Sequence, residues 1–222
     1  MSPCPDHRVP ADEQPSPVPG LSRLPEDFAH AVELLQAGQV VAFPTDTVYG
    51  VGAVAWNGGA VARLYRVKGR PDNKAIPILL ADPADLLRVA AANLPVAAAQ
   101  LAIRFWPGPL TMVLPKAPGI PDEVTLGGAT IAVRVPAHDL ARALIRAAGG
   151  ALATTSANLS GQPSAVRASE VAAQLDGRIP LILDGGPCPG GIPSTLVDLT
   201  GPAPLILRAG PISLEEILGS AC

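Results

Sequence analysis

Five positively charged side chains lie within twelve residues of one another, an arrangement that suits the binding of an anion. They are Arg63, Arg66, Lys68, Arg70 and Lys74, out of sixteen lysines and arginines in the whole chain. The last three border a glycine–proline turn that leads into an apolar segment, and cations held on a rigid turn suit a phosphate group such as that of a triphosphate. For Arg63 and Arg66, a solvated helix end with favourable helix-dipole interactions is the simpler interpretation.

Two expected strands each present polar side chains on one face. Successive side chains of a strand point to opposite faces, so residues two or four apart share a face. Thr130 and Arg134 are four apart in an otherwise apolar strand, where an arginine needs an anionic partner, either a ligand or a neighbouring acid. Thr154, Ser156 and Asn158 share a face in a second segment, which indicates either a ligand site or a helix cap and turn.

A third group of polar side chains follows directly on a short apolar run, residues 40–43. Thr45, Thr47 and Tyr49 have the same parity in the segment PTDTVYG, and loops that leave the end of a strand commonly carry ligand contacts. Asp46 in the same loop either closes a local turn or takes part in the site. The three groups together predict a ligand site assembled from distant parts of the chain.

Several familiar catalytic arrangements are missing from the sequence. It has no GxxxxGK[ST] phosphate loop and no CxxC pair, and its three cysteines lie far apart. Gly50, Gly52 and Ala55 match the loose GxGxxA dinucleotide pattern, but the glycines that follow would break the helix this motif needs, so a glycine-relaxed strand is the better interpretation. Ser156 lacks the GxSxG context of a hydrolase nucleophile. We expect neither a protein-ligated metal nor covalent catalysis.

The overall charge argues against a broad nucleic-acid-binding surface. The 222 residues include sixteen basic and nineteen acidic side chains, a formal net charge of -3, and few aromatics (three Phe, two Trp and two Tyr). A phosphate or nucleic-acid site must therefore be a local patch. No segment is apolar over the roughly 20 residues that cross a membrane. We expect a cytoplasmic protein with no membrane partner.

The hydrophobic pattern predicts one domain behind an irregular leader. Residues 1–25 contain seven prolines and no periodicity, so we expect a disordered Pro-rich leader and a folded catalytic domain at 26–222. Strands are expected at 40–43, 76–80, 110–114, 131–135, 152–155, 181–183, 195–199 and 205–207, and helices at 28–35, 57–65, 86–92, 96–105, 139–148, 166–175 and 214–218. This mixture predicts the α/β (α+β) class, with a single twisted mixed β-sheet and helices packed on it.

Seven short motifs occur in an order that is typical of one family. They are PTDTVYGVG, KGRP, WPGPLT, TIAVRVP, TSANLSG, PSTLVD and ILRAG, and they span roughly residues 26–218. In these motifs the chain resembles the YrdC-like family, the L-threonylcarbamoyladenylate synthases, in its short bacterial form. The resemblance implies a YrdC-like twisted sheet with a concave cationic cavity.

The resemblance also implies an activity and its partners. The family condenses L-threonine, bicarbonate and ATP to threonylcarbamoyl-AMP and pyrophosphate, with Mg²⁺ carried by ATP. The product then supplies the downstream tRNA threonylcarbamoyl transfer machinery, and direct contact with RNA is an open expectation. The physics agrees, because fixed cations can stabilise the charge on the leaving pyrophosphate without a catalytic cysteine or histidine.

The resemblance assigns roles to individual positions. Lys68 and Arg70 would be catalytic. The residues implied for L-threonine are Thr47, Arg134 and Thr154. The residues implied for ATP are Lys68, Arg70, Lys74, Thr130, Ser156, Asn158, Ser164 and Arg208. At Leu79 this chain departs from those relatives that carry a histidine near the amino acid.

Two other functions stay open at the level of sequence. Hydrogenase-maturation carbamoyltransferases contain similar segments, but they are longer chains with zinc-finger cysteines that are absent here. From a different class, a double-stranded RNA-binding or ribosome maturation module without this catalysis could use a concave basic surface to contact phosphates. The net negative charge and the few aromatic residues weaken that alternative.

Overall fold

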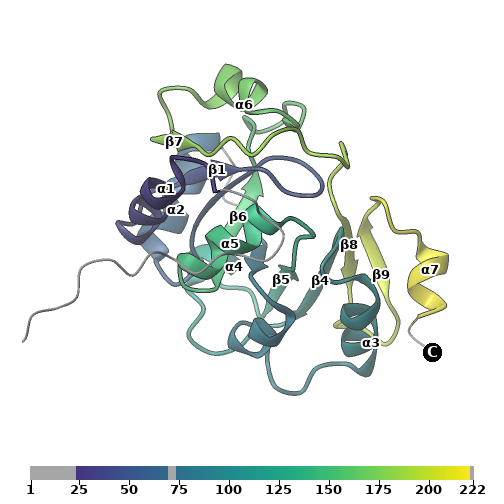
Figure 1. Cartoon of the computed structure of the whole chain (residues 1–222). Coiled ribbons are helices and arrows are strands. Elements are labelled where there is room, and N and C mark those ends of the chain that lie inside the picture. Colours follow the sequence, from purple (N-terminus) through teal and green to yellow (C-terminus); the bar gives the residue numbers. More distant parts are fainter. Residues whose placement is uncertain (1–23, 70–73, 221–222) are drawn as a thin grey trace, which may run out of the picture.

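The computed structural model describes residues 24–69 and 74–220, and within them nine strands form one continuous sheet (Figure 1). The strands are β1 (Val41–Phe43), β2 (Gly50–Val54), β3 (Ile78–Leu80), β4 (Leu110–Pro115), β5 (Thr130–Arg134), β6 (Ala151–Ser156), β7 (Leu181–Ile182), β8 (Thr195–Asp198) and β9 (Leu205–Arg208). Their order across the sheet is β7-β1-β2-β6-β3-β5-β4-β8-β9. Three neighbouring pairs, β1–β7, β3–β5 and β4–β8, are parallel and the others are antiparallel. The predicted mixed sheet is confirmed.

Helices cover both faces of this sheet. They are α1 (Phe28–Gln36), α2 (Gly58–Lys68), the 3₁₀ helix η1 (Pro83–Arg88), α3 (Val96–Phe105), α4 (Asp122–Thr125), α5 (Asp139–Ala147), α6 (Ala168–Leu175) and α7 (Leu214–Leu218). Helices α1 and α5 share one apolar cluster with alternate strand residues such as Phe43 and Leu152. The other helices pack in a second, larger cluster with the intervening residues, for example Ala42 and Ala153. The alternation of strand side chains thus divides the core into two layers.

The boundaries of α2 follow from its sequence and fix where its cations lie. Asn57 caps the helix, since its side-chain oxygen accepts a hydrogen bond from the backbone N–H of Ala60 at 3.0 Å. The helix ends at Gly69, whose φ of 58° is left-handed and favours glycine. Lys68 therefore occupies the last helical position, directly before Gly69.

One predicted helix is wrong. The alanine-rich segment 86–92 was expected to be helical, but the structure has the 3₁₀ helix η1 and then an extended stretch. Ala90 forms an isolated bridge with Lys116, and the N–H of Ala91 donates to the carbonyl of Pro115 at 2.9 Å. The N–H of Ala91 and the carbonyl of Val89, which a helix would have used, are instead paired with Pro115 at the end of β4 and with Ala117 just after it, so tertiary pairing overrides helix propensity.

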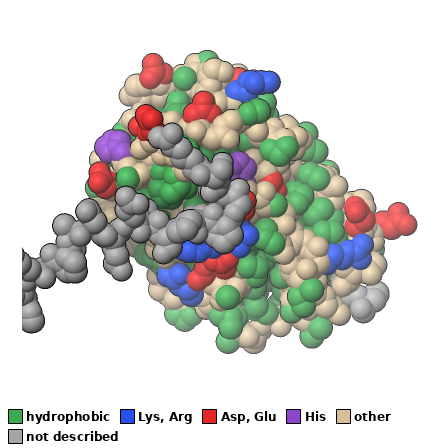
Figure 2. Space-filling view, in the orientation of Figure 1, with side chains coloured by type: hydrophobic (Ala, Val, Ile, Leu, Met, Phe, Trp, Pro, Cys, Tyr) green, Lys and Arg blue, Asp and Glu red, His purple; other side chains and the backbone are tan. Residues whose placement is uncertain are grey.

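Part of the sequence-based description falls outside the residues that the structure describes. This applies to residues 1–23 of the expected leader, to Arg70 and to residues 71–73 and 221–222. Within the described ranges, no helix is both long and apolar enough to cross a membrane. The same ranges contain no group of three His, Cys, Asp or Glu side chains that could hold a metal ion. Figure 2 shows acidic and basic side chains interspersed among the described residues of the visible face.

Candidate functional site

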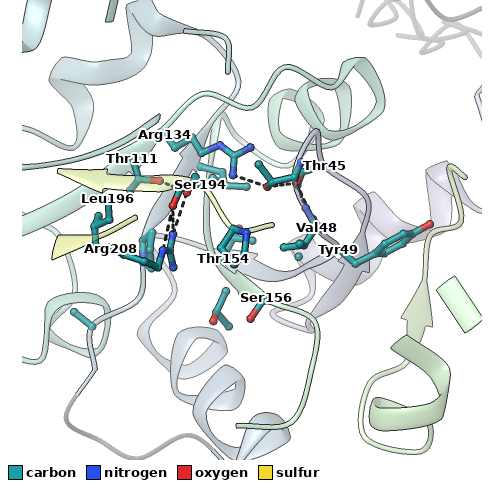
Figure 3. Close-up of a pocket in the computed structure, with 17 residues that line it drawn as sticks. Thr45, Val48, Tyr49, Thr111, Arg134, Thr154, Ser156, Ser194, Leu196 and Arg208 are labelled. Atoms are coloured by element: carbon teal, nitrogen blue, oxygen red, sulfur yellow. Dashed lines mark hydrogen bonds between the residues drawn. The ribbon is translucent and has the colours of Figure 1, made fainter. Parts of the chain in front are cut away.

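A cavity of about 230 Å³ lies on the sheet face that carries α1 and α5 (Figure 3). Leu79 of β3 belongs both to the α1/α5 core and to the cavity wall. Leu79 pairs with Arg134 of β5 on one side and with Leu152 of β6 on the other, so Arg134 and Thr154 lie on the same face. Among the described residues that line it, two are arginines and none is acidic.

The loop between β1 and β2 forms one wall of the cavity. The hydroxyl of Thr45 donates to the carbonyl of Val48 at 2.7 Å and accepts from the N–H groups of Thr47 and Val48. The two threonine hydroxyls are 3.0 Å apart, and because the Thr45 proton points to Val48, Thr47 is the donor in that contact. Thr45 and Thr47 are both buried. This tight turn fixes the Thr47 hydroxyl in the cavity wall before any ligand arrives.

Arg134 is held in one orientation by three partners. Its Nε donates to the carbonyl of Gly108 at 3.0 Å, its Nη1 donates to the hydroxyl of Thr47 at 2.9 Å, and its Nη2 donates to Asp46 at 2.5 Å. The side chain is 6% exposed. Burial lowers the pKa of the guanidinium, and the Asp46 carboxylate opposes that shift. Since a guanidinium has five N–H groups, two remain for a ligand, one on each terminal nitrogen.

Asp46 has a role that the sequence did not reveal. Its Oδ1 accepts from Arg134 and also from the backbone N–H of Ala137 at 3.1 Å, with the carboxylate side chain only 11% exposed. Asp46 does not line the cavity. It lies behind Arg134, so it can balance the buried charge and hold the guanidinium in place without meeting the ligand.

Two glycines on β2 leave room for Thr154. Gly52 pairs with Thr154 and Gly50 pairs with Ser156 across the antiparallel β2–β6 ladder. A Cβ atom on Gly52 would lie 2.9 Å from the Thr154 hydroxyl, and one on Gly50 would lie 2.8 Å from its methyl group. The GxG pattern that resembles a dinucleotide motif is therefore a strand, as expected, whose glycines allow the cavity to exist.

A second corner of the cavity surrounds Arg208 on β9. Its Nε and Nη2 donate to the carbonyl of Ser194 at 3.1 and 2.8 Å, and Nη2 also reaches the Ser194 hydroxyl at 3.1 Å. That hydroxyl lies 2.7 Å from the hydroxyl of Thr111 on β4. Figure 3 shows this group across the cavity from Thr45 and Val48. Thr111 and Ser194 were not predicted as site residues, although both lie in the motifs WPGPLT and PSTLVD.

Tyr49 shares the parity of Thr45 and Thr47 and lines the cavity, but its side chain is directed elsewhere. Its ring points away from the cavity in Figure 3, and its hydroxyl donates to the carbonyl of Gly186 at 2.8 Å and to Asp184 at 3.1 Å. Burial and the Asp184 carboxylate raise the pKa of this hydroxyl, which therefore stays a donor. Tyr49 anchors the loop after β7 and does not offer a group to a ligand.

The structure brings together some of the residues implied by the resemblance. Thr47, Arg134, Thr154, Ser156 and Arg208 line the cavity. Lys68 and Asn158 do not line it.

Lys68 and Asn158 support the turn that follows β6. The buried Lys68 ammonium donates to the carbonyls of Ser156 and Asn158, the latter at 2.6 Å. The Asn158 amide donates to the carbonyls of Leu159 and Gln162 at 2.8 and 2.7 Å, while its buried Oδ1 has no partner among the described residues. Both side chains shape the rim beside Ser156.

Three other implied residues lie away from the cavity lining. Thr130 is exposed at the start of β5, about 13 Å along the strand from Arg134. Lys74 is exposed, next to the lining residue Ala75, and Ser164 is half-buried. Arg70 lies outside the described residues, so its position relative to the cavity is not part of this geometry.

Comparisons with known proteins agree with one another. The family model Sua5_yciO_yrdC, with the description "Telomere recombination", matches residues 33–210. The threonylcarbamoyl-AMP synthase of Pyrococcus abyssi is 46% identical over 187 residues, which cover 84% of this chain and 55% of that protein. The threonylcarbamoyl-AMP synthase of Bacillus subtilis is 46% identical over 198 residues, which cover 89% of this chain and 57% of that protein.

A solved structure gives the same result. The crystal structure of P. abyssi Sua5 complexed with L-threonine matches with a TM-score of 0.83 and 43% identity, over 87% of this chain and 57% of that one. The chain therefore spans about half the length of the curated relatives it matches.

Proposed function

This chain belongs to the Sua5/YciO/YrdC family, and from that premise we propose that it is an L-threonylcarbamoyladenylate synthase. The amine of L-threonine attacks bicarbonate, and loss of water gives a carbamate. A carbamate oxygen then attacks the α-phosphorus of ATP, and the bond to the β-phosphate oxygen breaks. The products are threonylcarbamoyl-AMP and pyrophosphate. The names of the relatives support this reaction and give no support to the RNA-binding module as an alternative.

The geometry of Arg134 is the observation that carries the proposal. A buried guanidinium with three donors bound by the protein and two free suits one carboxylate, which would accept both remaining N–H groups. Thr47 and Thr154 flank that position and suit the hydroxyl and backbone groups of a small amino acid. In this proposal they are the L-threonine residues that the resemblance implied.

The nucleotide would extend away from Arg134. A cavity of about 230 Å³ is small against the ~300–1,000 Å³ of most ligand sites, so it suits an amino acid and one end of a nucleotide. Arg208 and Ser156 lie at its other parts, and Lys68, Arg70, Lys74, Thr130, Asn158 and Ser164 are proposed to complete the ATP site. Mg²⁺ would come with the phosphates of ATP, where it neutralises their charge.

Catalysis in this proposal relies on position and charge. Burial raises the pKa of the Cys188 thiol and lowers the pKa of His138, whose Nδ1 accepts from the N–H of Ala141 at 3.4 Å at the start of α5. Neither group is prepared for nucleophilic attack. Fixed donors around the cavity would instead hold the carbamate in line with the α-phosphorus, where Lys68 and Arg70 are the proposed catalytic cations.

We also propose where the reaction takes place and which machinery uses its product. Residues 26–222 would form the catalytic domain, and the reaction would take place in the cytoplasm, where ATP and tRNA are available. The product would pass to the tRNA threonylcarbamoyl transfer machinery, because a mixed anhydride of a carbamate and AMP is an activated donor that a second enzyme must consume.

Pyrophosphate release from ATP tests the function directly. The assay is run with L-threonine and bicarbonate omitted in turn, and the adenylate product is identified by mass. We expect release only when both are present, because the carbamate that attacks ATP contains atoms from each. Release that continues without L-threonine would contradict the proposal, and so would a product without the threonyl group.

A further inference from the structure

A second cavity, of about 480 Å³, lies on another part of the molecule. It is lined by Arg63, Arg66 and Val67 of α2 and by Arg178 in the turn before β7. It shares no lining residue with the first cavity. Because α2 packs in the larger core cluster, it covers the sheet face opposite to the one that carries α1, α5 and Arg134. This cavity therefore needs an explanation of its own.

The three arginines of this cavity lack partners within the described part of the chain. No ion pair and no side-chain hydrogen bond joins Arg63, Arg66 or Arg178 to any residue of 24–69 or 74–220. The Nε of Arg63 is buried and has no partner there, although a buried donor without one costs free energy. By contrast, Arg142 and Arg146 both reach Asp82, at 2.5 and 2.7 Å.

Of the three arginines, only Arg66 has a position that a favourable interaction with the helix dipole explains. Of the basic residues on α2, Arg66 and Lys68 lie in the last turn, where a cation is favourable, and Arg63 lies before it. Arg63 and Arg66 are three residues apart, a spacing at which like charges destabilise a helix. Arg178 comes from a segment more than a hundred residues away and adds a third positive charge to the same cavity. Three guanidinium groups around one cavity suit the binding of an anion.

We propose that this cavity binds a phosphate-bearing anion that carries more than one negative charge. Guanidinium groups bind phosphate oxygens through paired N–H donors, and three of them match a polyphosphate or neighbouring phosphates of a nucleic-acid chain better than they match a single carboxylate. The half-buried Arg63 would hold the anion at the base, and the exposed Arg66 and Arg178 would close on it from either side. This inference does not rest on the proposed synthase activity.

Amide chemical shifts in titrations with pyrophosphate, and separately with a short RNA hairpin, test this site. Val67 and Gly177 report on the second cavity, while Thr47 and Thr154 report on the first, so binding at the two places is distinguished. The test variant is Arg66→Gln with Arg178→Gln. The matched control is Arg104→Gln with Arg167→Gln, which removes the same charge from two exposed arginines elsewhere. All four substitutions are on the surface, so both proteins should fold.

We expect pyrophosphate to shift Val67 and Gly177 in the unaltered protein. The test variant should bind about 10-fold more weakly or worse at this site, the scale of one lost charge-assisted hydrogen bond, and the control should change affinity less than about 2-fold. If only the hairpin shows this dependence, the anion is the backbone of a nucleic acid and the proposal stands. If neither ligand shifts Val67 and Gly177, or if both double variants weaken binding equally, the proposal is overturned.

Discussion

The two arginine-lined cavities differ in whether other protein groups bind their arginine side chains. In the first, Arg134 is buried, bound through three of its N–H groups and paired with Asp46. In the second, Arg63, Arg66 and Arg178 have no such partners among the described residues. The first cavity therefore holds its cation in a fixed orientation before a ligand binds, as a site for chemistry requires, whereas the second leaves its cations adjustable.

The largest effect should come from removing Arg134. Arg134→Gln takes away both free donors and leaves Asp46 buried without its cation. We expect threonine-dependent pyrophosphate release to fall by about 10²-fold or more and the free energy of unfolding to fall by about 3 kcal/mol. Steady-state kinetics and urea unfolding measure the two changes.

The control is Arg66→Gln, in the second cavity. It should change the rate by no more than about 2-fold and the free energy of unfolding by no more than about 0.5 kcal/mol. Equal losses in both variants would remove the distinction between the cavities.

Asp46→Asn tests whether the fixed orientation matters apart from the arginine itself. The variant keeps an oxygen for the N–H of Ala137 but loses the negative charge that holds Arg134. Because the guanidinium can then turn, we expect the KM for L-threonine to rise by about 10-fold, with a smaller change in kcat. Asp27→Asn, on an exposed residue that makes no side-chain cap, is the control. An unchanged KM in Asp46→Asn would show that Arg134 needs no support.

A glycine-to-alanine change should lower the stability of the protein when it is made in β2 and raise it when it is made in α2. In Gly52→Ala the new Cβ would lie 2.9 Å from the Thr154 hydroxyl and 3.0 Å from the Phe43 ring, which leaves too little space. We expect a loss of about 1–2 kcal/mol in unfolding free energy and a KM for L-threonine raised a few-fold. In Gly59→Ala, on α2, the Cβ meets only Asn57 at 3.5 Å, and stability should rise by about 0.5 kcal/mol. Thermal unfolding of both variants measures this, and a stabilised Gly52→Ala would contradict the role of the β2 glycines.

The smallest effect concerns Asp82, which pairs with the half-buried Arg142 and the exposed Arg146. Burial tends to raise the pKa of Asp82, but hydrogen bonds from Arg146 and Arg142 outweigh it, so the pKa is lowered. A lowered pKa means that Asp82 stabilises the fold above the ordinary aspartate pKa of about 3.9 and that this contribution is lost as the pH falls below it. We expect Asp82→Asn to reduce stability by about 1 kcal/mol or less at pH 7, and by less as the pH falls through the lowered pKa of Asp82. A difference that did not shrink as the pH fell would exclude the charge pair as its cause.

The sequence predicted those site residues that follow local rules. Strand parity placed Arg134 on one face of β5 and Thr154 with Ser156 on one face of β6, and the structure has them so. It could not predict that β3 lies between those two strands, because strand order depends on pairing between distant segments. Parity also failed for Tyr49, which lies just before β2 in a loop that turns its ring away.

Local sequence patterns could not predict contacts between residues that are far apart in the sequence. The pairing of Asp46 with Arg134 joins residues 88 apart, and the Thr111–Ser194 contact joins residues 83 apart. Lys68 is proposed to contact a phosphate, and no local pattern indicates that its ammonium also donates to the carbonyls of Ser156, at the end of β6, and of Asn158. The second cavity depends on Arg178 lying beside α2, and nothing local to residue 178 indicates that neighbour.

The affinity of the protein for L-threonine compared with that for L-threoninamide, both measured by calorimetry, tests the central claim most directly. The amide keeps the amine and the side chain but lacks the carboxylate charge, so it cannot satisfy the two free N–H groups of Arg134. We expect the amide to bind at least about 30-fold more weakly, as when one member of a buried charge pair is removed. Equal affinity for the two compounds would contradict the assignment of Arg134 to the carboxylate of the substrate.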